Sequence, residues 1–302
     1  MSKLSSYLFL SIPVLLITGP FLSDLALSLI VILFLIEVFK NKKFELFHNK
    51  FFYLFFSFYI YLILNSLLQN QNIDSLRISL SYFRFGVFSL AVVYIINNDN
   101  QILKKLYYIF LITFSVLVLD GFTQFFHGKN ILGYPLSVGP RVSSLFNDEL
   151  ILGSYLSRFF PIFFALLIFL NKKINKVQYI FSYLIFIFAE VLVYLSGERV
   201  AFFYMNFAAV FTLLAVKDFK KLRIGILLSS LTLIFIISFT FPNTKQRVFN
   251  QTFDQMGLFS DKENIIFSHQ HNDLYKTAIN IVKDNLYFGV GVKNFRNKCS
   301  LD

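Results

Sequence analysis

Residues 179–216 read YIFSYLIFIFAEVLVYLSGERVAFFYMNFAAVFTLLAV. Two continuous apolar runs, 179–195 and 200–216, are separated only by the short segment Ser196–Arg199. Each run approaches the roughly 17–25 residues that a tilted transmembrane helix needs. The pattern predicts a hairpin of two membrane-spanning helices. Its very tight connection lies at a membrane surface and leaves Arg199 little freedom to move.

Apolar runs of this kind recur along the chain. They lie at about 4–18, 24–39, 51–68, 79–96, 106–123, 149–170, 179–195, 200–216 and 224–241. The chain is 56% hydrophobic and 15% charged, with a mean hydropathy of +0.64, whereas soluble domains carry about 25% charged residues. Unlike β-barrel strands, the runs do not alternate. We expect an all-α polytopic membrane protein with about nine transmembrane helices in a membrane domain, 1–241. The start of a large extracytoplasmic loop, 242–302, follows.

The distribution of Lys and Arg predicts the orientation, because positively charged short loops stay in the cytoplasm. With the N-terminus inside, the inside segments hold Lys3, Lys40, Lys42, Lys43, Lys50, Lys104, Lys105, Lys172, Lys173, Lys176, Lys217, Lys220, Lys221 and Arg223, and the outside loops hold Arg77, Lys129, Arg141 and Arg199. We therefore expect 242–302 outside the cytoplasm. The net charge of +11 does not indicate nucleic-acid binding, since the lysines lie between apolar runs and not on one face.

Two arginines of the predicted outside loops are candidate phosphate ligands. Arg141 lies in the Gly- and Pro-rich loop 124–148, where its planar guanidinium can bind a phosphate or remain an ordinary exposed charge. Arg199 suits the diphosphate of a polyprenyl-linked sugar. The alternatives for it are a salt bridge to Glu198 or a contact with a lipid headgroup. At the end of the loop, Asn147–Glu149 are expected to cap the following helix.

Few ionisable residues lie within the apolar runs, where charge is costly and each one is a functional candidate. They are Arg84, Arg158, Glu190 and, near the outer end of its run, Asp120. For the first three we favour a structural ion pair or a side chain that reaches the membrane surface.

The polar end of the chain contains Ser268–Arg296, SHQHNDLYKTAINIVKDNLYFGVGVKNFR. A helix is expected over 272–284, laid on the membrane domain. Its apolar stripe consists of Leu274, Ala278, Ile281 and Val282. His269 and His271 precede it, and a neutral imidazole there can accept a proton from a sugar hydroxyl or simply be solvated. No Cys, Glu or third His stands at ligand spacing, so we expect no metal.

Three segments, in this order, resemble the O-antigen ligase/O-antigen polymerase superfamily of membrane glycosyltransferases. The first is Asp120–Pro161. The second, Ser196–Ala201 (SGERVA), is similar to the family's Ser-Gly-x-Arg-small-small hairpin. The third, Tyr275–Phe295, resembles an aromatic-x-x-Ala helix followed by a Gly-x-Gly-x-x-Asn-Phe turn. Together they cover most of residues 115–302.

The resemblance implies a GT-C-like, metal-independent and cofactor-free transferase at the outer face of a bacterial inner membrane, in lipopolysaccharide or surface polysaccharide biosynthesis. Its partners would be an undecaprenyl-diphosphate-linked glycan donor, a lipid or glycan acceptor and membrane lipids, with 242–302 periplasmic. Arg199 would bind the donor diphosphate, and Arg141 is the next candidate. The family's second arginine is replaced by His271. Either His271 takes that role, besides being our candidate catalytic base, or Arg247 or another cation does.

The family's catalytic His-x-His-Asn motif comes later than the one at 269–272, which precedes the Gly-x-Gly turn. We therefore expect that motif and the last spans beyond Asp302, which would leave this sequence truncated and without an essential part. Ligase and polymerase share these motifs and are not separated by them. Two other classes use the same features: a transporter or flippase for an anionic lipid or polysaccharide, and an inactive membrane scaffold. No internal repeat or paired broken span favours a transporter.

Overall fold

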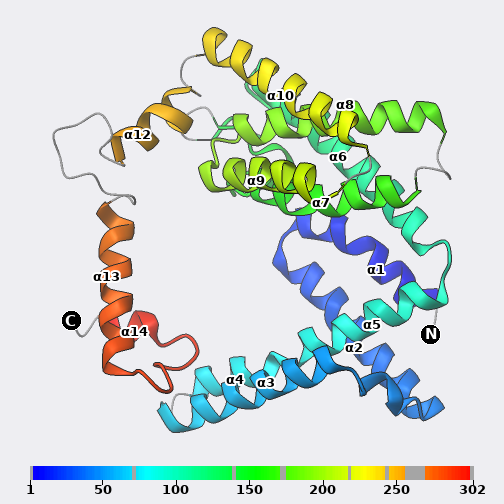
Figure 1. The fold of residues 1–302 in the computed structure, drawn as a ribbon, viewed down its shortest axis with the longest axis vertical. Coiled ribbons are helices and arrows are strands. Elements are labelled where there is room, and N and C mark those ends of the chain that lie inside the picture. The colour runs from blue at the N-terminus through cyan, green and yellow to red at the C-terminus, as the bar shows by residue number, and fades with distance from the viewer. Residues whose placement is uncertain are drawn as a thin grey trace. The chain divides into compact units, whose positions relative to one another are not determined.

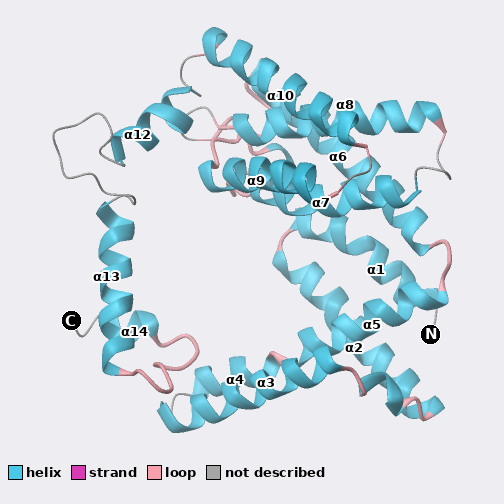
Figure 2. Ribbon diagram, viewed as in Figure 1, coloured by secondary structure: helices cyan, strands magenta, loops and turns pink. Residues whose placement is uncertain are grey.

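The computed structural model describes residues 3–69, 73–137, 141–170, 175–216, 219–241, 245–255 and 269–299 (Figure 1). Helices dominate these residues (Figure 2), and β-structure among them is confined to two isolated bridges, Lys129 with Pro135 and Ser137 with Arg141. The prediction of an all-helical protein is confirmed, since long apolar runs without alternation satisfy their backbone hydrogen bonds within each helix.

Seven helical segments in the described part of the chain are long and apolar enough to cross a membrane. They are α2 (Pro20–Asn41), α3 (Lys50–Gln69), α4 and α5 counted together (Ile73–Ser81 and Phe83–Asn98), α6 (Ile102–His127), α7 (Leu152–Leu170), α8 (Lys176–Leu195) and α10 (Lys220–Thr240). The chain is thus a multi-pass helical membrane protein. Shorter apolar helices correspond to the other two predicted spans, α1 (Lys3–Leu15, extended by a 3-10 turn, η1, to Thr18) and α9 (Arg199–Ala215). The count of nine spans stays a prediction.

The chain divides into two compact units, each with its own packing. The first comprises Met1–Phe9, Asp24–Asn100 and Asp254–Asp302, and the second comprises Leu10–Ser23 and Gln101–Phe253. The proposed boundary between a membrane domain, 1–241, and an extracytoplasmic region, 242–302, stays a prediction.

The second unit is built around α8, which packs against α6, α7, α9 and α10. Phe186, near the middle of α8, is fully buried, and its ring lies 4.7–5.5 Å from those of Phe160, Phe163 and Phe164 on α7. Aromatic contacts at these separations add to the burial of apolar area. The end of α8 that carries the tight hairpin is therefore held from several sides.

Two buried polar side chains of α8 are hydrogen-bonded to α10. Glu190 accepts a hydrogen bond from Ser230 Oγ at 2.7 Å, and the Tyr194 hydroxyl lies 2.7 Å from Ser238 Oγ. Such bonds are typical of helix contacts within membranes. Glu190 is fully buried and has a serine partner, so neither an ion pair nor an interfacial position, the two roles favoured for it, describes it.

In the first unit, α3, α4 and α5 pack together. Arg84 forms an ion pair with Asp24 of α2 at 2.7 Å, as favoured for this residue. Gly86 permits the close approach of α5 and α3, since a Cβ there would lie 2.2 Å from the Phe55 ring. In the second unit, Arg158 is exposed on α7, which suits a side chain that reaches the membrane surface.

The polar end of the first unit contains α13 (His269–Asp284) and α14 (Phe295–Cys299). The predicted helix is confirmed and begins three residues earlier than 272. Its apolar stripe is only partly buried, because Ile281 is covered whereas Leu274 and Val282 remain more than half exposed. The expectation that this helix is laid on the membrane domain stays a prediction.

The turn between α13 and α14 is fixed to α3 and α4 (Figure 1). The Phe288 carbonyl accepts hydrogen bonds from the Tyr61 hydroxyl, at 3.1 Å, and from Asn65 Nδ2. Ser75 Oγ donates to the Val292 carbonyl at 2.9 Å. The remaining short elements are the 3-10 turns η2 (Phe44–Phe47) and η3 (Ser144–Phe146), the π-helical turn η5 (Gln246–Asn250) and α12 (Gln251–Gln255).

The predicted orientation can be tested at Cys299, the one cysteine of the sequence, which is half-buried on α14. A membrane-impermeant maleimide added to intact spheroplasts of an expressing bacterium should label this residue, because 242–302 is expected outside the cytoplasm. The double variant Cys299→Ser, Lys221→Cys is the control and should react only after lysis. Labelling of Cys299 that likewise requires lysis would reverse the orientation.

Candidate anion-binding site

The loop that carries Arg141 is tied to the end of α6 by a buried carboxylate. Asp120 is fully buried and accepts hydrogen bonds from Asn130 Nδ2 at 3.1 Å, the Ile131 amide at 2.9 Å and Ser144 Oγ at 2.7 Å. A buried carboxylate with several donors is well satisfied. Asp120, left open between function and structure by the sequence, thus anchors this loop.

Gln124, one turn further along α6, holds the same loop from the other side. Its Oε1 accepts hydrogen bonds from the amides of Ser143 and Ser144 at 2.9 and 2.7 Å, and its Nε2 donates to the Pro135 carbonyl at 3.0 Å. The Val142 amide also donates to the Leu195 carbonyl at the end of α8, at 3.3 Å. Arg141 is therefore fixed beside the hairpin by bonds on both of its flanks.

The connection between α8 and α9 turns sharply at Gly197. This residue has a φ of +65°, a left-handed conformation that glycine adopts without steric cost. Its amide donates to the Tyr194 carbonyl at 3.1 Å, which closes the last turn of α8. The predicted tight hairpin is confirmed, and the carbonyls of Ser196 and Gly197 remain available as acceptors for side chains.

Glu198 of the hairpin binds the first turn of α7. Its carboxylate accepts from the Gly153 amide at 2.6 Å, and from the amide and the hydroxyl of Ser154 at 3.0 and 2.6 Å. A carboxylate at a helix N-terminus satisfies orphan amides and complements the helix dipole. The cap of this helix thus comes from a distant part of the sequence, and the expectation that Asn147–Glu149 supply it is wrong.

Three arginines gather around the hairpin. Arg141 Nε donates to the Ser196 carbonyl at 2.7 Å, and Arg247 Nε donates to the Gly197 carbonyl at 3.4 Å. A Cβ on Gly197 would lie 3.1 Å from Arg247 Nε and 3.3 Å from Arg141 Nε. Arg199, the first residue of α9, points Nη2 at Gln251 Oε1 at 3.5 Å. We call Arg141, Arg199 and Arg247 the arginine cluster.

The arginine cluster is a site of crowded positive charge. Burial lowers the pKa of the Arg141 guanidinium, the charge of Arg247 lowers it further, and Arg199 adds to the same effect, whereas Glu198 raises it. Arginine nevertheless stays charged in proteins, so the consequence is mutual repulsion rather than deprotonation. An anion that bridges these groups would relieve that repulsion. Guanidinium groups favour phosphate because their planar fork of N–H donors can bond two phosphate oxygens at once.

The structure thus brings Arg141 and Arg199 together. Their roles as ligands of a diphosphate stay predictions. The sequence analysis gave Arg247 only as an alternative to His271 for the role of the family's second arginine. In the structure it is the third member of the arginine cluster. It lies in η5, a polar segment after α10, without a motif that marks it. Its position follows from the fold alone.

His271 belongs to the first compact unit, whereas the arginine cluster belongs to the second. It lies in the first turn of α13 and is exposed, with its ring centroid 6.5 Å from that of Tyr275. The side chain of His269 lies outside the described residues. Among those that are described, no three His, Cys, Asp or Glu residues are close enough to hold a metal ion.

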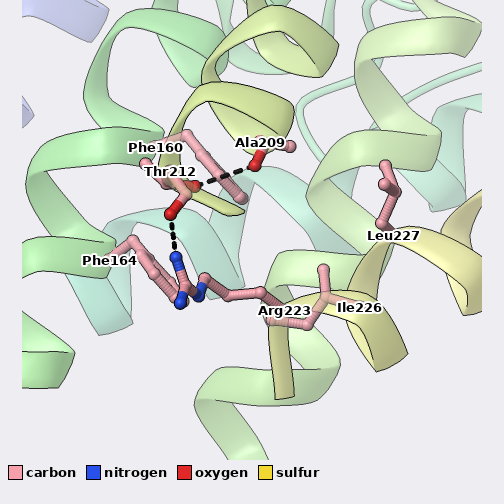
Figure 3. Close-up of a pocket in the computed structure, with 7 residues that line it drawn as sticks. All are labelled: Phe160, Phe164, Ala209, Thr212, Arg223, Ile226 and Leu227. Carbon is pink, nitrogen blue, oxygen red and sulfur yellow. Dashed lines mark hydrogen bonds between the residues drawn. The ribbon is translucent and has the colours of Figure 1, made fainter. Parts of the chain in front are cut away.

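A recess between α7, α9 and α10 is a weaker candidate (Figure 3). Its volume is about 10 Å³, the space of a single water molecule. Figure 3 shows Arg223 extended from α10 to the Thr212 carbonyl, and its other terminal nitrogen donates to Val216. Cations at the end of a helix bind its last carbonyls, so Arg223 has a structural role at the end of α9.

No protein-family model, curated protein or solved structure matches this chain.

The contact of Glu198 with α7 predicts a stability effect. Glu198→Ala should cost about 0.5–2 kcal/mol, as other lost helix caps do, and should lower the thermal midpoint in detergent by a few degrees. Glu149→Ala, which alters an exposed acid near the same helix, should leave the midpoint within about one degree of the parent. Equal effects of the two variants would refute the assignment of the cap to Glu198.

Proposed function

We propose that the protein transfers or polymerises glycan from an undecaprenyl-diphosphate-linked donor at the outer face of a bacterial inner membrane, as O-antigen ligases and polymerases do. The observation that carries this proposal is the arginine cluster around the hairpin. It is supported by the multi-pass helical character of the chain, which suits a donor whose tail stays in lipid. The resemblance of three separate segments to that superfamily gives the chemistry.

In this proposal the arginine cluster binds the donor diphosphate and stabilises it as a leaving group. An acceptor hydroxyl attacks the anomeric carbon of the donor sugar, a new glycosidic bond forms, and the bond from that carbon to the diphosphate breaks. Undecaprenyl diphosphate leaves with the bonding electrons, and its growing negative charge is stabilised by fixed cations. The proton of the acceptor hydroxyl passes to a base, for which His271 is the candidate.

Rigid placement of the cations is what this reaction would require. The hydrogen bonds of Arg141 and Arg247 to the hairpin carbonyls fix one edge of each guanidinium. Their other nitrogens are then held in place before the donor arrives, which reduces the cost of ordering on binding. Glu198, the acid of the hairpin, is engaged by α7 and does not form the salt bridge to Arg199 that was considered as an alternative.

Donor binding tests the proposal directly. Arg199→Ala, Arg141→Ala and Arg247→Ala should each weaken the binding of undecaprenyl diphosphate to the protein in nanodiscs by about 10- to 150-fold, because each removes a hydrogen bond between charged groups. Arg77→Ala, an exposed arginine of α4, should leave the affinity unchanged. Unaltered affinity in all three cluster variants would remove the arginine cluster from the mechanism.

The role of His271 is tested separately from binding. In the full-length protein supplied with a lipid-linked glycan, His271→Ala should reduce glycan transfer by about 100-fold or more, the range of general-base catalysis. The same variant should retain the donor affinity of the parent protein. Wild-type transfer rates in His271→Ala would show that another group takes the proton. Movement of the lipid across the bilayer without a new glycosidic bond would instead favour a flippase.

A further inference from the structure

One side of α9 carries an exposed row of aromatic rings. Phe203, Phe207 and Phe211 are each more than half exposed. The ring centroids lie 6.0 Å apart from Phe203 to Phe207 and 6.4 Å apart from Phe207 to Phe211, and successive ring planes are inclined by only 18° and 20°. Ala201 and Met205 of the same helix are buried, so α9 has a covered side and an exposed aromatic side. We call Phe203, Phe207 and Phe211 the phenylalanine row.

The phenylalanine row leads away from the arginine cluster. Arg199 is the first residue of α9 and stands four residues before Phe203. Steps of four residues follow one ridge of a helix surface, which winds slowly around the axis. At a rise of about 1.5 Å per residue, Arg199 and Phe211 are separated by about 18 Å along the axis. This is more than half of the roughly 30 Å thickness of a bilayer's hydrocarbon core. One ridge of α9 thus connects a cation to a long apolar path.

The position of the row beside the arginine cluster sets it apart from other exposed rings. Apolar side chains on a membrane helix are ordinarily covered by lipid tails, and their exposure alone marks no site. Phe235 and Phe239 of α10 are such a pair, since both are exposed and their ring centroids lie 4.7 Å apart. None of the three arginines of the cluster lies on α10. The pair on α10 therefore provides a matched comparison that has the rings without the cluster.

The chemistry along this ridge narrows the ligand. The arginine cluster suits an anionic head, and a phosphate in particular. The phenylalanine row offers only apolar ring surface, which gains dispersion contacts from an apolar chain that lies against it. The row is one ring wide, so it accommodates a single chain rather than the paired chains of a phospholipid. A ligand that matches both parts carries a phosphate head on one long apolar tail.

We propose that the phenylalanine row binds the polyprenyl chain of the lipid-linked donor, an inference that rests on the proposed function for the place of the diphosphate head. The bilayer already gives the chain apolar surroundings, so the row adds packing rather than a hydrophobic driving force. It confines the chain to one side of α9. The head is thereby delivered to the arginine cluster from one direction, which reduces the orientations that binding must select.

Binding of two probes to the whole chain in phosphatidylcholine nanodiscs tests this proposal. Undecaprenyl diphosphate has the head and the tail, and inorganic diphosphate has the head alone. The double variant Phe207→Leu, Phe211→Leu keeps the helix apolar but removes two rings. It should bind undecaprenyl diphosphate about tenfold more weakly than the parent, because ring contacts with the chain are lost. It should bind inorganic diphosphate with the affinity of the parent. The matched variant Phe235→Leu, Phe239→Leu should leave both affinities unchanged.

The outcomes separate the tail site from the head site. Parent affinity for undecaprenyl diphosphate in the Phe207, Phe211 variant would overturn the phenylalanine row, as would an equal loss in the α10 variant. Displacement of undecaprenyl diphosphate by phosphatidylglycerol at equal concentration would show a general lipid surface and also overturn it. So would dissociation of an oligomer in the same variant, which would assign the face to a second copy. Retention of both probes by Arg199→Ala would instead count against the arginine cluster and the proposed function.

Discussion

The short connection between α8 and α9 forces two carbonyl groups, those of Ser196 and Gly197, out of the helical hydrogen-bond pattern. Each of them accepts a hydrogen bond from an arginine side chain that arrives from a distant part of the sequence. Because the turn needs a left-handed residue, glycine stands at its corner and leaves room for both guanidinium groups. The convergence of charge in the second unit depends on this turn.

The same turn also positions Glu198, the acidic side chain of the hairpin. Glu198 accepts hydrogen bonds from the first amides of α7, so the acid next to Arg199 stabilises a helix. Burial lowers the pKa of the Arg141 guanidinium, and the charges of Arg247 and Arg199 lower it further. Assembling like charges is unfavourable, and the structure tolerates it through bonds to neutral oxygens. In the proposed function, a bound anion offsets the positive charge that these arginines share.

Much of the fold could be predicted from sequence, because long apolar runs correspond closely to helices, and the tight hairpin follows from four residues between two such runs. Arg141 and Arg199 were also named as candidates, since Lys and Arg are sparse in the loops that are predicted to lie outside the cytoplasm. Their convergence with Arg247 was not predicted, because it depends on the path of the loop that Asp120 and Gln124 hold. The cap of α7 by Glu198 is a contact of this kind as well. The apolar stripe of α13 predicted the helix, but such a pattern does not say what covers the apolar face.

The central claim is that the hairpin assembles a diphosphate site. It is tested most directly by an experimental structure of the full-length protein in nanodiscs with undecaprenyl diphosphate bound. The account predicts density for the diphosphate beside Gly197, with terminal guanidinium nitrogens of Arg141, Arg199 and Arg247 within hydrogen-bond distance of its oxygens. A diphosphate bound at another place, with these three arginines turned to other partners, would contradict it.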